Sequence, residues 1–424
     1  MMQGADATCM GGDAHNPLSC PDAKQVERRS IRSPVHRTGF IMTSKERHQA
    51  RYERRKRKRA AKRQAAIAEY DNYDRLCTCN ALFRAARLSG KSIRWKASVQ
   101  RYFMSFLRNV IELRGKLLAG QDVTMGFIEF DLIERGKRRH IKSVHFKERV
   151  AQRSLCDNAL VPVLSRSLIY DNGASLEGKG ISFARDRLKH HLHQYYRRTG
   201  SNEGYVLLMD FSGYFDSILH EPLYEMLDRA FSDKRICQLC RTFIEPFGEK
   251  SLGIGSQVSQ ILAISYRSSI DHYVKEVLRI REYGCYMDDC YLIHESKDYL
   301  WHCLSEIERL CDEKGITINR KKTQVVKLSH GFPYMKGRYY LTSTGKVIVK
   351  PSKANTARQR RKLKKFRRFL DSGEMPLEAI VCAHNSYRGY ILKDYNSHKT
   401  VRSMDKLFHE LYGYDTRING KEKF

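Results

Sequence analysis

The chain has 424 residues, which is enough for two or three domains with their own hydrophobic cores. Its 78 Lys and Arg residues outnumber 47 Asp and Glu residues, giving a formal net charge of +31. An excess of this size argues against an enzyme for neutral small molecules and indicates a polyanionic partner, most simply nucleic acid.

No apolar run is long enough to span a membrane, and the N-terminus lacks the pattern of a signal peptide, so we expect no membrane association. The 12 cysteines follow no disulfide-scaffold spacing, which predicts a reducing, cytoplasmic location. The single CxxC motif, Cys237 and Cys240, has no second pair at zinc-finger spacing. We therefore predict two buried thiols on one helix face.

Residues 1–42 show no periodicity and are predicted to be a disordered extension. Met42 is an alternative translation start, so the expression of residues 1–41 is a hypothesis that N-terminal sequencing would test. Residues 43–75 are predicted to form a basic helical arm, because Lys and Arg are dense between Lys45 and Lys62. Two interpretations stay open, a solvated charged helix and an arm that contacts phosphates.

Residues 76–204 are predicted to alternate helices and short strands. Strand-like residues 126–133 and 141–146 flank a predicted basic turn over residues 134–140, a combination suited to binding triphosphate or template phosphates. A helix is predicted over residues 147–167. The Gly-rich residues 171–180 then allow close backbone approach to phosphate and lead into a helix predicted over residues 181–191.

Two further stretches deliver carboxylates. The apolar run from Tyr205 ends in Asp210 and predicts a buried central strand with an acid at its C-terminal end. Residues 284–294 predict a β-hairpin with Asp288 and Asp289 at its turn. An ordinary hairpin turn also accounts for a bare Asp-Asp pair, because Asp is a common turn residue.

The remaining elements are helical. A loop at residues 251–260 is predicted to open a helix over residues 261–278, and apolar residues at 3–4 spacing predict an amphipathic helix over residues 299–314. Three helices are predicted near the C-terminus, over residues 356–370, 376–392 and 397–412, and the first is strongly basic.

Asp210 and Asp288 come from different predicted strands, and a sheet that brings the two strand ends together makes a carboxylate cluster. Such oxygen ligands suit Mg²⁺, with Mn²⁺ as the alternative. Two such ions stabilise the attacking and leaving oxygens of a displacement at phosphorus. With the basic loops and the net charge, this pattern predicts nucleotidyl transfer.

Tyr286-Met-Asp-Asp289 resembles the signature of reverse transcriptases, and the resemblance continues in order across residues 130–410. The further matching stretches are Arg139 with residues 148–152, residues 171–175 with 178–180, residues 210–218, residues 315–319 with Lys322 and Thr323, and residues 332–339. The last of these resembles the primer grip. The lineage that the motifs resemble is bacterial and includes group II introns, retrons and diversity-generating retroelements.

The resemblance implies an α+β right-hand polymerase that makes DNA from an RNA template, a primer strand and dNTPs with two divalent ions. It places the fingers at residues 76–204, the palm with an antiparallel sheet and the catalytic aspartates at 205–341, and a helical thumb at 342–424. An accessory protein or a cognate noncoding RNA is a further expected partner.

The resemblance also assigns residues. The catalytic set is Asp210, Asp288, Asp289 and Lys322, and the metal set is Asp210, Phe211, Asp288 and Asp289. The substrate set is Arg139, Arg149, Lys179, Phe215, Ile254, Gly255 and Gln260, and the nucleic-acid set is Lys336, Arg358, Arg361 and Lys365. Lys322 would protonate departing pyrophosphate, with a solvated loop lysine as the alternative. Phe215 would exclude a ribose 2′-OH, with a packed core aromatic as the alternative.

The sequence departs from many reverse transcriptases at the loop preceding the third palm helix, where Ile254 precedes Gly255 in place of a Gln. Together with Ser259 and Gln260 this pattern resembles diversity-generating retroelement enzymes, which copy template adenines with errors. An apolar residue cannot hydrogen-bond near the incoming nucleotide, so lower selectivity is expected. The alternatives are an antiphage-defence, retron or intron enzyme, and from another class a non-catalytic RNA-binding or maturase-like protein or a basic scaffold.

Overall fold

The computed structural model describes residues 43–134 and 137–414, so the predicted disordered segment, residues 1–42, lies outside the described residues. The chain divides into two compact units, residues 1–60 and residues 61–424, and each is described by itself. The described residues form helices together with antiparallel sheets. The α+β fold class predicted from the sequence is therefore confirmed.

The first described element is the basic helix α1 (Ser44–Ala68). A capping box starts it: the Glu46 N–H donates to Thr43 Oγ1 at 3.3 Å, and the Thr43 N–H donates to Glu46 Oε2 at 2.7 Å. Every side chain between Lys45 and Lys62 is exposed. Exposure fits both interpretations of the predicted arm, so its contact with phosphates stays a prediction.

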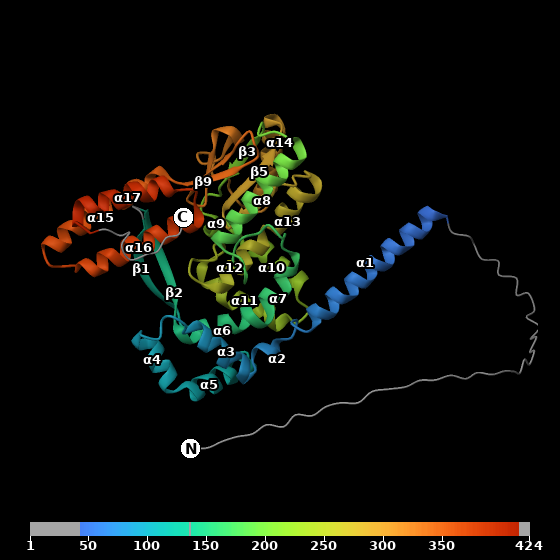
Figure 1. Ribbon diagram of the computed structural model, residues 1–424. Helices are drawn as coiled ribbons and strands as arrows, with labels where there is room; N and C mark the ends of the chain where they lie inside the picture. Colours follow the sequence, from blue (N-terminus) through green and yellow to red (C-terminus); the bar gives the residue numbers. More distant parts are fainter. Residues whose placement is uncertain (1–42, 135–136, 415–424) are drawn as a thin grey trace, which may run out of the picture. The chain divides into compact units, whose positions relative to one another are not determined.

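Short helices pack together in the N-terminal part of the second unit (Figure 1). They are α2 (Tyr73–Leu76), α3 (Cys79–Ser89), α4 (Ala97–Met104) and α5 (Phe106–Leu118). Tyr73 is buried, and its hydroxyl donates to the Leu117 carbonyl at 3.0 Å. The last residues of the predicted basic arm thus belong to the packed core.

β1 (Phe127–Glu134) and β2 (Lys137–Val144) form a two-stranded antiparallel sheet. The predicted turn over residues 134–140 is wrong, because strand pairing continues to Glu134 and Lys137. Arg138 donates to Asp131 across the strands at 2.5 Å, and His140 lies 3.2 Å from the same carboxylate. Cross-strand charge pairs of this kind let residues with weak strand preference extend the ladder.

After the hairpin, the predicted helix over residues 147–167 is present in several joined parts. They are α6 (Phe146–Leu155), a π-helical turn (Cys156–Leu160), α7 (Val161–Leu164) and a 3₁₀ turn (Ser165–Ser167). The next helix, α8 (Ile181–Thr199), extends beyond the predicted end at residue 191. Buried Leu192 and Tyr195 continue its apolar face, and Gly200 ends it in a left-handed conformation at φ 70°.

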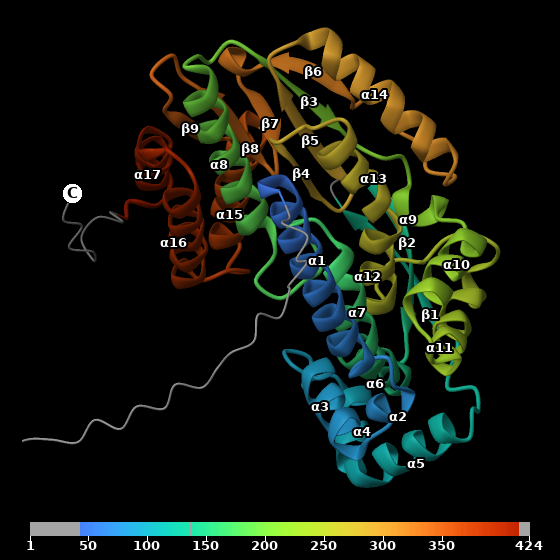
Figure 2. The same cartoon turned by 90° about the vertical axis from the view of Figure 1, so that its right-hand side faces the viewer.

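The central sheet of the described residues contains β3 (Tyr205–Met209), β4 (Tyr283–Tyr286), β5 (Asp289–His294) and β6 (Gln324–Lys327), in the order β4-β5-β3-β6. All its pairings are antiparallel, and β3 is internal as predicted. Successive β3 side chains face opposite sides, so Leu207 and Met209 enter one core cluster, while Val206 and Leu208 enter another. Figure 2 shows α14 (Lys297–Asp312) and α8 on opposite sides of this sheet.

The outer edge of β4 is covered by the segment Asp171–Gly173. The Cys285 N–H donates to the Asp171 carbonyl at 3.2 Å, and the Gly173 N–H donates to the Cys285 carbonyl at 2.8 Å. A Cβ on Gly173 would lie 2.8 Å from Ala184 Cβ, so only glycine allows this approach. The Gly-rich loop is thus packed directly against the predicted catalytic hairpin.

Helices inserted between β3 and β4 complete the main core. They are α9 (Tyr214–Ser217), α10 (His220–Ala230), α11 (Lys234–Ile244), α12 (Gln257–Tyr266) and α13 (Ser268–His272), followed by a π-helical turn (Tyr273–Val277). The predicted helix over residues 261–278 begins earlier, because Ser256 caps α12 by accepting from the Ser259 N–H at 3.4 Å.

Cys237 and Cys240 are buried free thiols on α11, as predicted. In the described part of the chain, no helix combines the length and the apolar composition needed to cross a bilayer.

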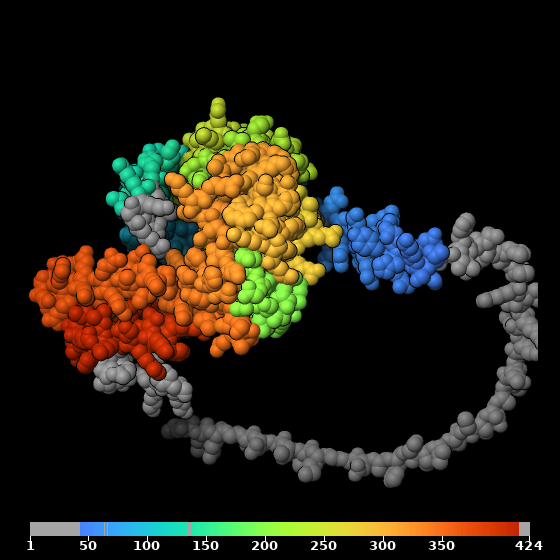
Figure 3. Space-filling view, turned by 90° about the horizontal axis from the view of Figure 1, so that it is seen from above, coloured from blue at the N-terminus to red at the C-terminus, as the bar shows by residue number. Residues whose placement is uncertain are grey.

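The C-terminal part pairs a small antiparallel sheet with helices. Its strands are β7 (Phe332–Tyr334), β8 (Gly337–Leu341) and β9 (Val347–Pro351), and its helices are α15 (Lys353–Asp371), α16 (Leu377–Asp394) and α17 (His398–Tyr412). The three predicted C-terminal helices are therefore present. The segment from residue 342, which was expected to be helical, begins with the strand β9 paired to β8. Figure 3 shows the orange surface in this part of the chain continuing into the red surface of the C-terminal helices.

Truncating Leu304 should test the packing of α14 against the sheet. Leu304 has no exposed surface, so Leu304→Ala should lower the free energy of unfolding by about 2–5 kcal/mol through reduced burial and a residual cavity. Leu107, which is 64% exposed on α5, is the matched control, and Leu107→Ala should change stability by less than about 0.5 kcal/mol. Denaturant unfolding of both variants checks this, and equal losses of stability would contradict the packing described.

Candidate active site

The predicted carboxylates meet at one end of the central sheet because of strand register. Met209 of β3 pairs with Cys290 of β5, so the following residue, Asp210, comes alongside Asp289. Tyr286 pairs with Asp289 across the hairpin, which leaves Met287 and Asp288 as its two-residue turn. The structure therefore brings together the three aspartates that the sequence pattern selects.

Asp210 is held by groups from the segment before β6. Its side chain is buried, and Oδ2 accepts from Lys322 Nζ at 2.5 Å and from Asn319 Nδ2 at 3.2 Å. The Asn319 N–H also donates to the Asp210 carbonyl at 2.7 Å. The hydrogen bond to Asp210 is the main reason why the pKa of Lys322 is raised. Lys322 thus lies beside the predicted metal ligand Asp210. Its role in donating a proton to pyrophosphate stays a prediction.

The pKa of the Asp289 carboxyl group is raised by its surroundings. Its side chain reaches solvent, but the surrounding walls limit its hydration, and this loss of hydration is the main cause that raises its pKa to about 6. The negative charges of Asp288 and Asp210 raise the pKa further, and the Lys322 ammonium opposes them. Loss of hydration and repulsion between carboxylates therefore both disfavour a charged Asp289 at this sheet end.

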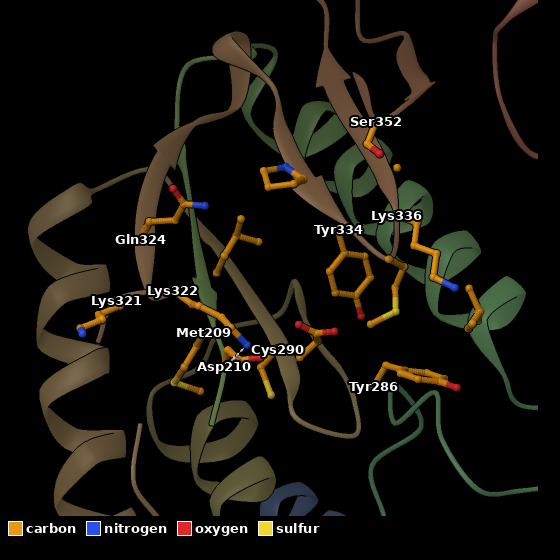
Figure 4. A pocket seen from close by; sticks show the side chains of 16 residues that line it. Met209, Asp210, Tyr286, Cys290, Lys321, Lys322, Gln324, Tyr334, Lys336 and Ser352 are labelled. Carbon is orange, nitrogen blue, oxygen red and sulfur yellow. Dashed lines mark hydrogen bonds and ion pairs between the residues drawn. The ribbon is translucent and has the colours of Figure 1, made fainter. Parts of the chain in front are cut away.

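These groups open into a cavity of about 610 Å³ between the central sheet and the β7–β8 hairpin (Figure 4). Asp289 lines this cavity, and Figure 4 shows Asp210 and Lys322 on one wall with Tyr334 and Lys336 on the other. The predicted nucleic-acid residue Lys336 is exposed in the turn between β7 and β8. The cavity thus joins the predicted catalytic groups to the hairpin that resembles the primer grip.

The residues present fit divalent cations by the chemistry of their donors. Asp210, Asp288 and Asp289 offer hard oxygen ligands, and a cation would relieve the repulsion that raises the pKa of Asp289. Phe211 has a buried side chain, so its backbone carbonyl is the oxygen that it can offer. Within residues 43–134 and 137–414, no three acidic, His or Cys side chains already surround one point, and the Lys322 ammonium neutralises Asp210.

The predicted catalytic hairpin rests on a buried arginine that the sequence analysis missed. Arg267 of α12–α13 is 1% exposed, and its Nη1 donates to the Met287 carbonyl in the turn. Its Nε pairs with Asp271 at 3.2 Å, and Tyr283 donates to the same Asp271 oxygen at 2.5 Å. An Arg with an Asp four residues later in an otherwise apolar helix is the signal that predicts an internal ion pair.

Two predicted phosphate-binding residues, Arg149 and Lys179, lie away from the cavity lining. Arg139 is a β2 residue opposite Leu132 in the strand register, and its side chain lies outside the described part of the structure. Arg149 donates to Ser143 Oγ at 3.3 Å, and Lys179 Nζ donates to the Tyr170 carbonyl at 2.6 Å. Their binding of phosphates stays a prediction.

The predicted nucleotide-selecting residues lie on the segment after Asp210, on the loop before α12 and in the first turns of α12. Phe215 is half-buried against the main core, and its carbonyl accepts from the Leu252 N–H at 3.0 Å. Ile254 is 39% exposed, and Gly255 has φ +115°, which favours glycine. Gln260 is exposed and accepts from Ser175 Oγ at 3.4 Å.

A buried polar chain anchors this loop. Glu148 accepts from the Met125 N–H at 3.1 Å and from Gln152 Nε2 at 2.8 Å, and Ser256 Oγ donates to Gln152 Oε1 at 2.8 Å. Burial is the main cause that raises the pKa of Glu148. Glu148 and Gln152 lie in the stretch over residues 148–152 that resembles the family. Their hydrogen bonds hold the N-terminus of α12, and neither side chain lines the cavity.

The predicted nucleic-acid residues of α15 share one exposed face. Arg358, Arg361 and Lys365 are exposed and lie three and four residues apart, while Gln359 and Leu363 are buried on the opposite face. The helix thus presents cations outward from an apolar support.

Residues 135–356, just over half of the chain, match the family model described as reverse transcriptase (RNA-dependent DNA polymerase). No curated protein matches the chain.

Among solved structures, the chain is similar to apo telomerase from Candida tropicalis truncated from its C-terminal domain, with 13% identity, a TM-score of 0.41 and coverage of 53% of this chain and 55% of that chain. Telomerase from Candida albicans in complex with a TWJ fragment of telomeric RNA gives 12% identity, a TM-score of 0.44 and coverage of 70% and 61%. Apo telomerase from Candida tropicalis gives 14% identity, a TM-score of 0.40 and coverage of 57% of this chain and 53% of that chain. The chain spans between 53% and 61% of these telomerase chains.

The raised pKa of Asp289 predicts a pH-dependent effect of Asp289→Asn. A carboxyl group whose pKa rises from 3.8 to about 6 on folding contributes stability that is lost as the pH increases through that range. Without divalent ions, Asp289→Asn should therefore raise the melting temperature at pH 7.5, on the order of 2 °C, and should have little effect at pH 3.5. Thermal unfolding at both pH values checks this, and a larger gain at the lower pH would contradict it.

Proposed function

The chain belongs to the reverse transcriptase (RNA-dependent DNA polymerase) family, and on that basis we propose that it extends a primer 3′-OH with deoxynucleotides on an RNA template. The observation that carries the proposal is the register of β3 with β5, which sets Asp210 beside Asp289 at a cavity. Neighbouring carboxylates are unfavourable without a cation, so a fold that assembles them indicates a metal-dependent reaction.

Divalent ions held by Asp210, Asp288, Asp289 and the Phe211 carbonyl would stabilise charge on the attacking and leaving oxygens. We assign Mg²⁺, with Mn²⁺ as the alternative. Lys322 keeps an ammonium at the cavity wall, 2.5 Å from Asp210, and this position suits proton donation to departing pyrophosphate. Phe215 is proposed to exclude a ribose 2′-OH, which comparison of dNTP and rNTP incorporation by Phe215→Ala would test.

The proposed nucleic-acid path runs from the cavity to the C-terminal helices. Lys336 lies on the cavity wall opposite Asp210, and Arg358, Arg361 and Lys365 form an exposed basic face on α15. Cations on a helix face contact phosphates without reading sequence, which suits an enzyme that follows a template of any sequence. Residues 342–424 would act as the thumb and residues 76–204 as the fingers.

For the biological setting, we propose a cytoplasmic bacterial retroelement of the diversity-generating type, served by an accessory protein or a cognate noncoding RNA. The support is Ile254, whose exposed apolar side chain precedes Gly255 where a Gln would offer hydrogen bonds. Sequencing of the extension products tests this: misincorporation confined to template adenines, reduced in Ile254→Gln, is expected. Even error rates at all template bases would favour the antiphage-defence or retron assignment instead.

Removing one carboxylate should separate catalysis from folding. Asp210→Asn removes a charged ligand while keeping the shape of the side chain, and should lower the rate of nucleotide addition by about 10²–10³-fold or more. Primer extension on a defined RNA template with dNTPs and Mg²⁺ measures this. Asp298→Asn, an exposed change in the first turn of α14, is the matched control and should retain activity.

If wild-type protein and Asp210→Asn both fail to extend the primer while still binding RNA, a non-catalytic RNA-binding role replaces the polymerase proposal.

The basic face of α15 should contribute affinity that depends on salt. Replacing Arg358, Arg361 and Lys365 with Ala should weaken primer–template binding similarly for different sequences. The slope of log affinity against log salt should fall by about 1 for each phosphate that is no longer neutralised. Fluorescence anisotropy at several salt concentrations checks this. Arg229→Ala, which removes an exposed arginine on α10, should leave the slope unchanged, and an unchanged slope in the triple variant would contradict the proposed face.

A further inference from the structure

Arg185 of α8 is a buried arginine that joins three parts of the chain at one guanidinium. It is 4% exposed, and its Nε and Nη2 donate to the Met335 carbonyl at 3.1 and 2.6 Å. Its Nη1 pairs with Asp394 Oδ2 at 2.7 Å near the end of α16. Nη2 also donates to the Tyr390 hydroxyl at 3.3 Å and to the Tyr395 hydroxyl.

The carbonyl that Arg185 holds belongs to an unusual turn. Tyr334 pairs with Gly337, so Met335 and Lys336 form a two-residue hairpin turn between β7 and β8. Both residues have positive φ values, 44° and 65°, as the mirror-image hairpin turns require. Such turns favour Asn and Gly, because a side chain with a Cβ is strained at positive φ. The sequence therefore opposes this turn locally, and an external contact has to hold it.

This turn forms part of the cavity that contains the catalytic carboxylates. Met335, Lys336 and Gly337 line the same cavity as Asp210 and Asp289. Figure 4 shows Lys336 across the cavity from Asp210. Arg185 does not line the cavity, so its influence on the cavity passes through Met335. The pair with Asp394 extends the same contact to the helices after residue 353.

We propose that Arg185 is a positioning residue for nucleotide addition, which holds the Met335–Lys336 turn in its strained conformation and links it to α16. This inference rests on the proposed polymerase function, in which the primer strand lies along the β7–β8 hairpin. The distance between the primer 3′ end and the carboxylates then depends on a guanidinium that touches neither. A displacement of about 1 Å at a reacting end costs about 10²-fold in rate.

The alternative is that Arg185 only joins α8 to α16 through its buried pair with Asp394. A glycine at position 335 separates the two roles, because glycine adopts positive φ without strain and needs no external contact. If Arg185 holds the turn, its loss matters less when residue 335 is glycine. If it only joins the helices, its loss matters equally in both backgrounds.

The first measurement is single-turnover primer extension by wild type, Arg185→Gln, Met335→Gly and the double variant. Arg185→Gln should slow addition by about 10–100-fold in the wild-type background, with little change in the KM for dNTP, and by no more than about threefold in the Met335→Gly background. Equal factors in the two backgrounds would overturn the inference.

The second measurement does not depend on polymerase activity. Hydrogen exchange of backbone amides in residues 332–341 should become faster in Arg185→Gln, and should not change when the same substitution is made in Met335→Gly. Unchanged exchange in Arg185→Gln would overturn the inference. An inactive wild type with the expected exchange pattern would support the turn-holding role and overturn the proposed function instead.

Two further variants guard against loss of folding. Arg185→Lys keeps the charge but reaches one acceptor rather than several, so it should give an intermediate exchange rate in residues 332–341. Asp394→Asn removes the ion pair and leaves both hydrogen bonds to Met335, so it should lower the melting temperature with little effect on that exchange. If the amides of residues 332–341 exchange as fast in Asp394→Asn as in Arg185→Gln, the proposal that Arg185 holds the turn through Met335 is overturned.

Discussion

The pairing register between β3 and β5 is the constraint on which the rest of the molecule depends. A shift by one residue would move Asp210 away from Asp289 and would turn every β3 side chain to the opposite face. The two core clusters prevent that shift, because Leu207 and Met209 belong to one and Val206 and Leu208 to the other. Apolar burial on both faces therefore supplies the force that keeps two like charges adjacent, against the loss of hydration and the charge repulsion that raise the pKa of Asp289.

The surroundings of the carboxylates divide into groups that compensate charge and groups that fix shape. Lys322 compensates Asp210 from the cavity side, and Arg267 holds the Met287 carbonyl from the core side. Met287 and Met335 both stand at positive φ, and in each case an arginine from a distant helix donates to the carbonyl of the turn residue. Both hairpins that border the cavity are thus specified by long-range contacts rather than by their own turn residues.

Sequence patterns predicted the carboxylates, the central strand and the C-terminal helices, because each depends on local periodicity or on adjacent residues. The β1–β2 turn was predicted too long, since the pairing of Arg138 with Asp131 appears only once the strands are aligned. Arg185 and Arg267 were missed for a related reason. The partners of Arg185 lie far along the chain. Arg267 reaches the Met287 carbonyl in a different element, although its Asp271 partner is only four residues away. An arginine in a helix pattern is more often on the surface than in a core, so neither contact was expected. The position of Lys322 came from family resemblance alone, without support from periodicity.

The cover on β4 has a consequence for how the sheet behaves toward other chains. An exposed strand edge offers unpaired backbone groups to any extended segment, and this is a common route to aggregation. Asp171–Gly173 already occupies those groups on Cys285, so a foreign strand cannot add to the sheet at that point without displacing the loop. The Gly-rich loop therefore also blocks strand addition at Cys285.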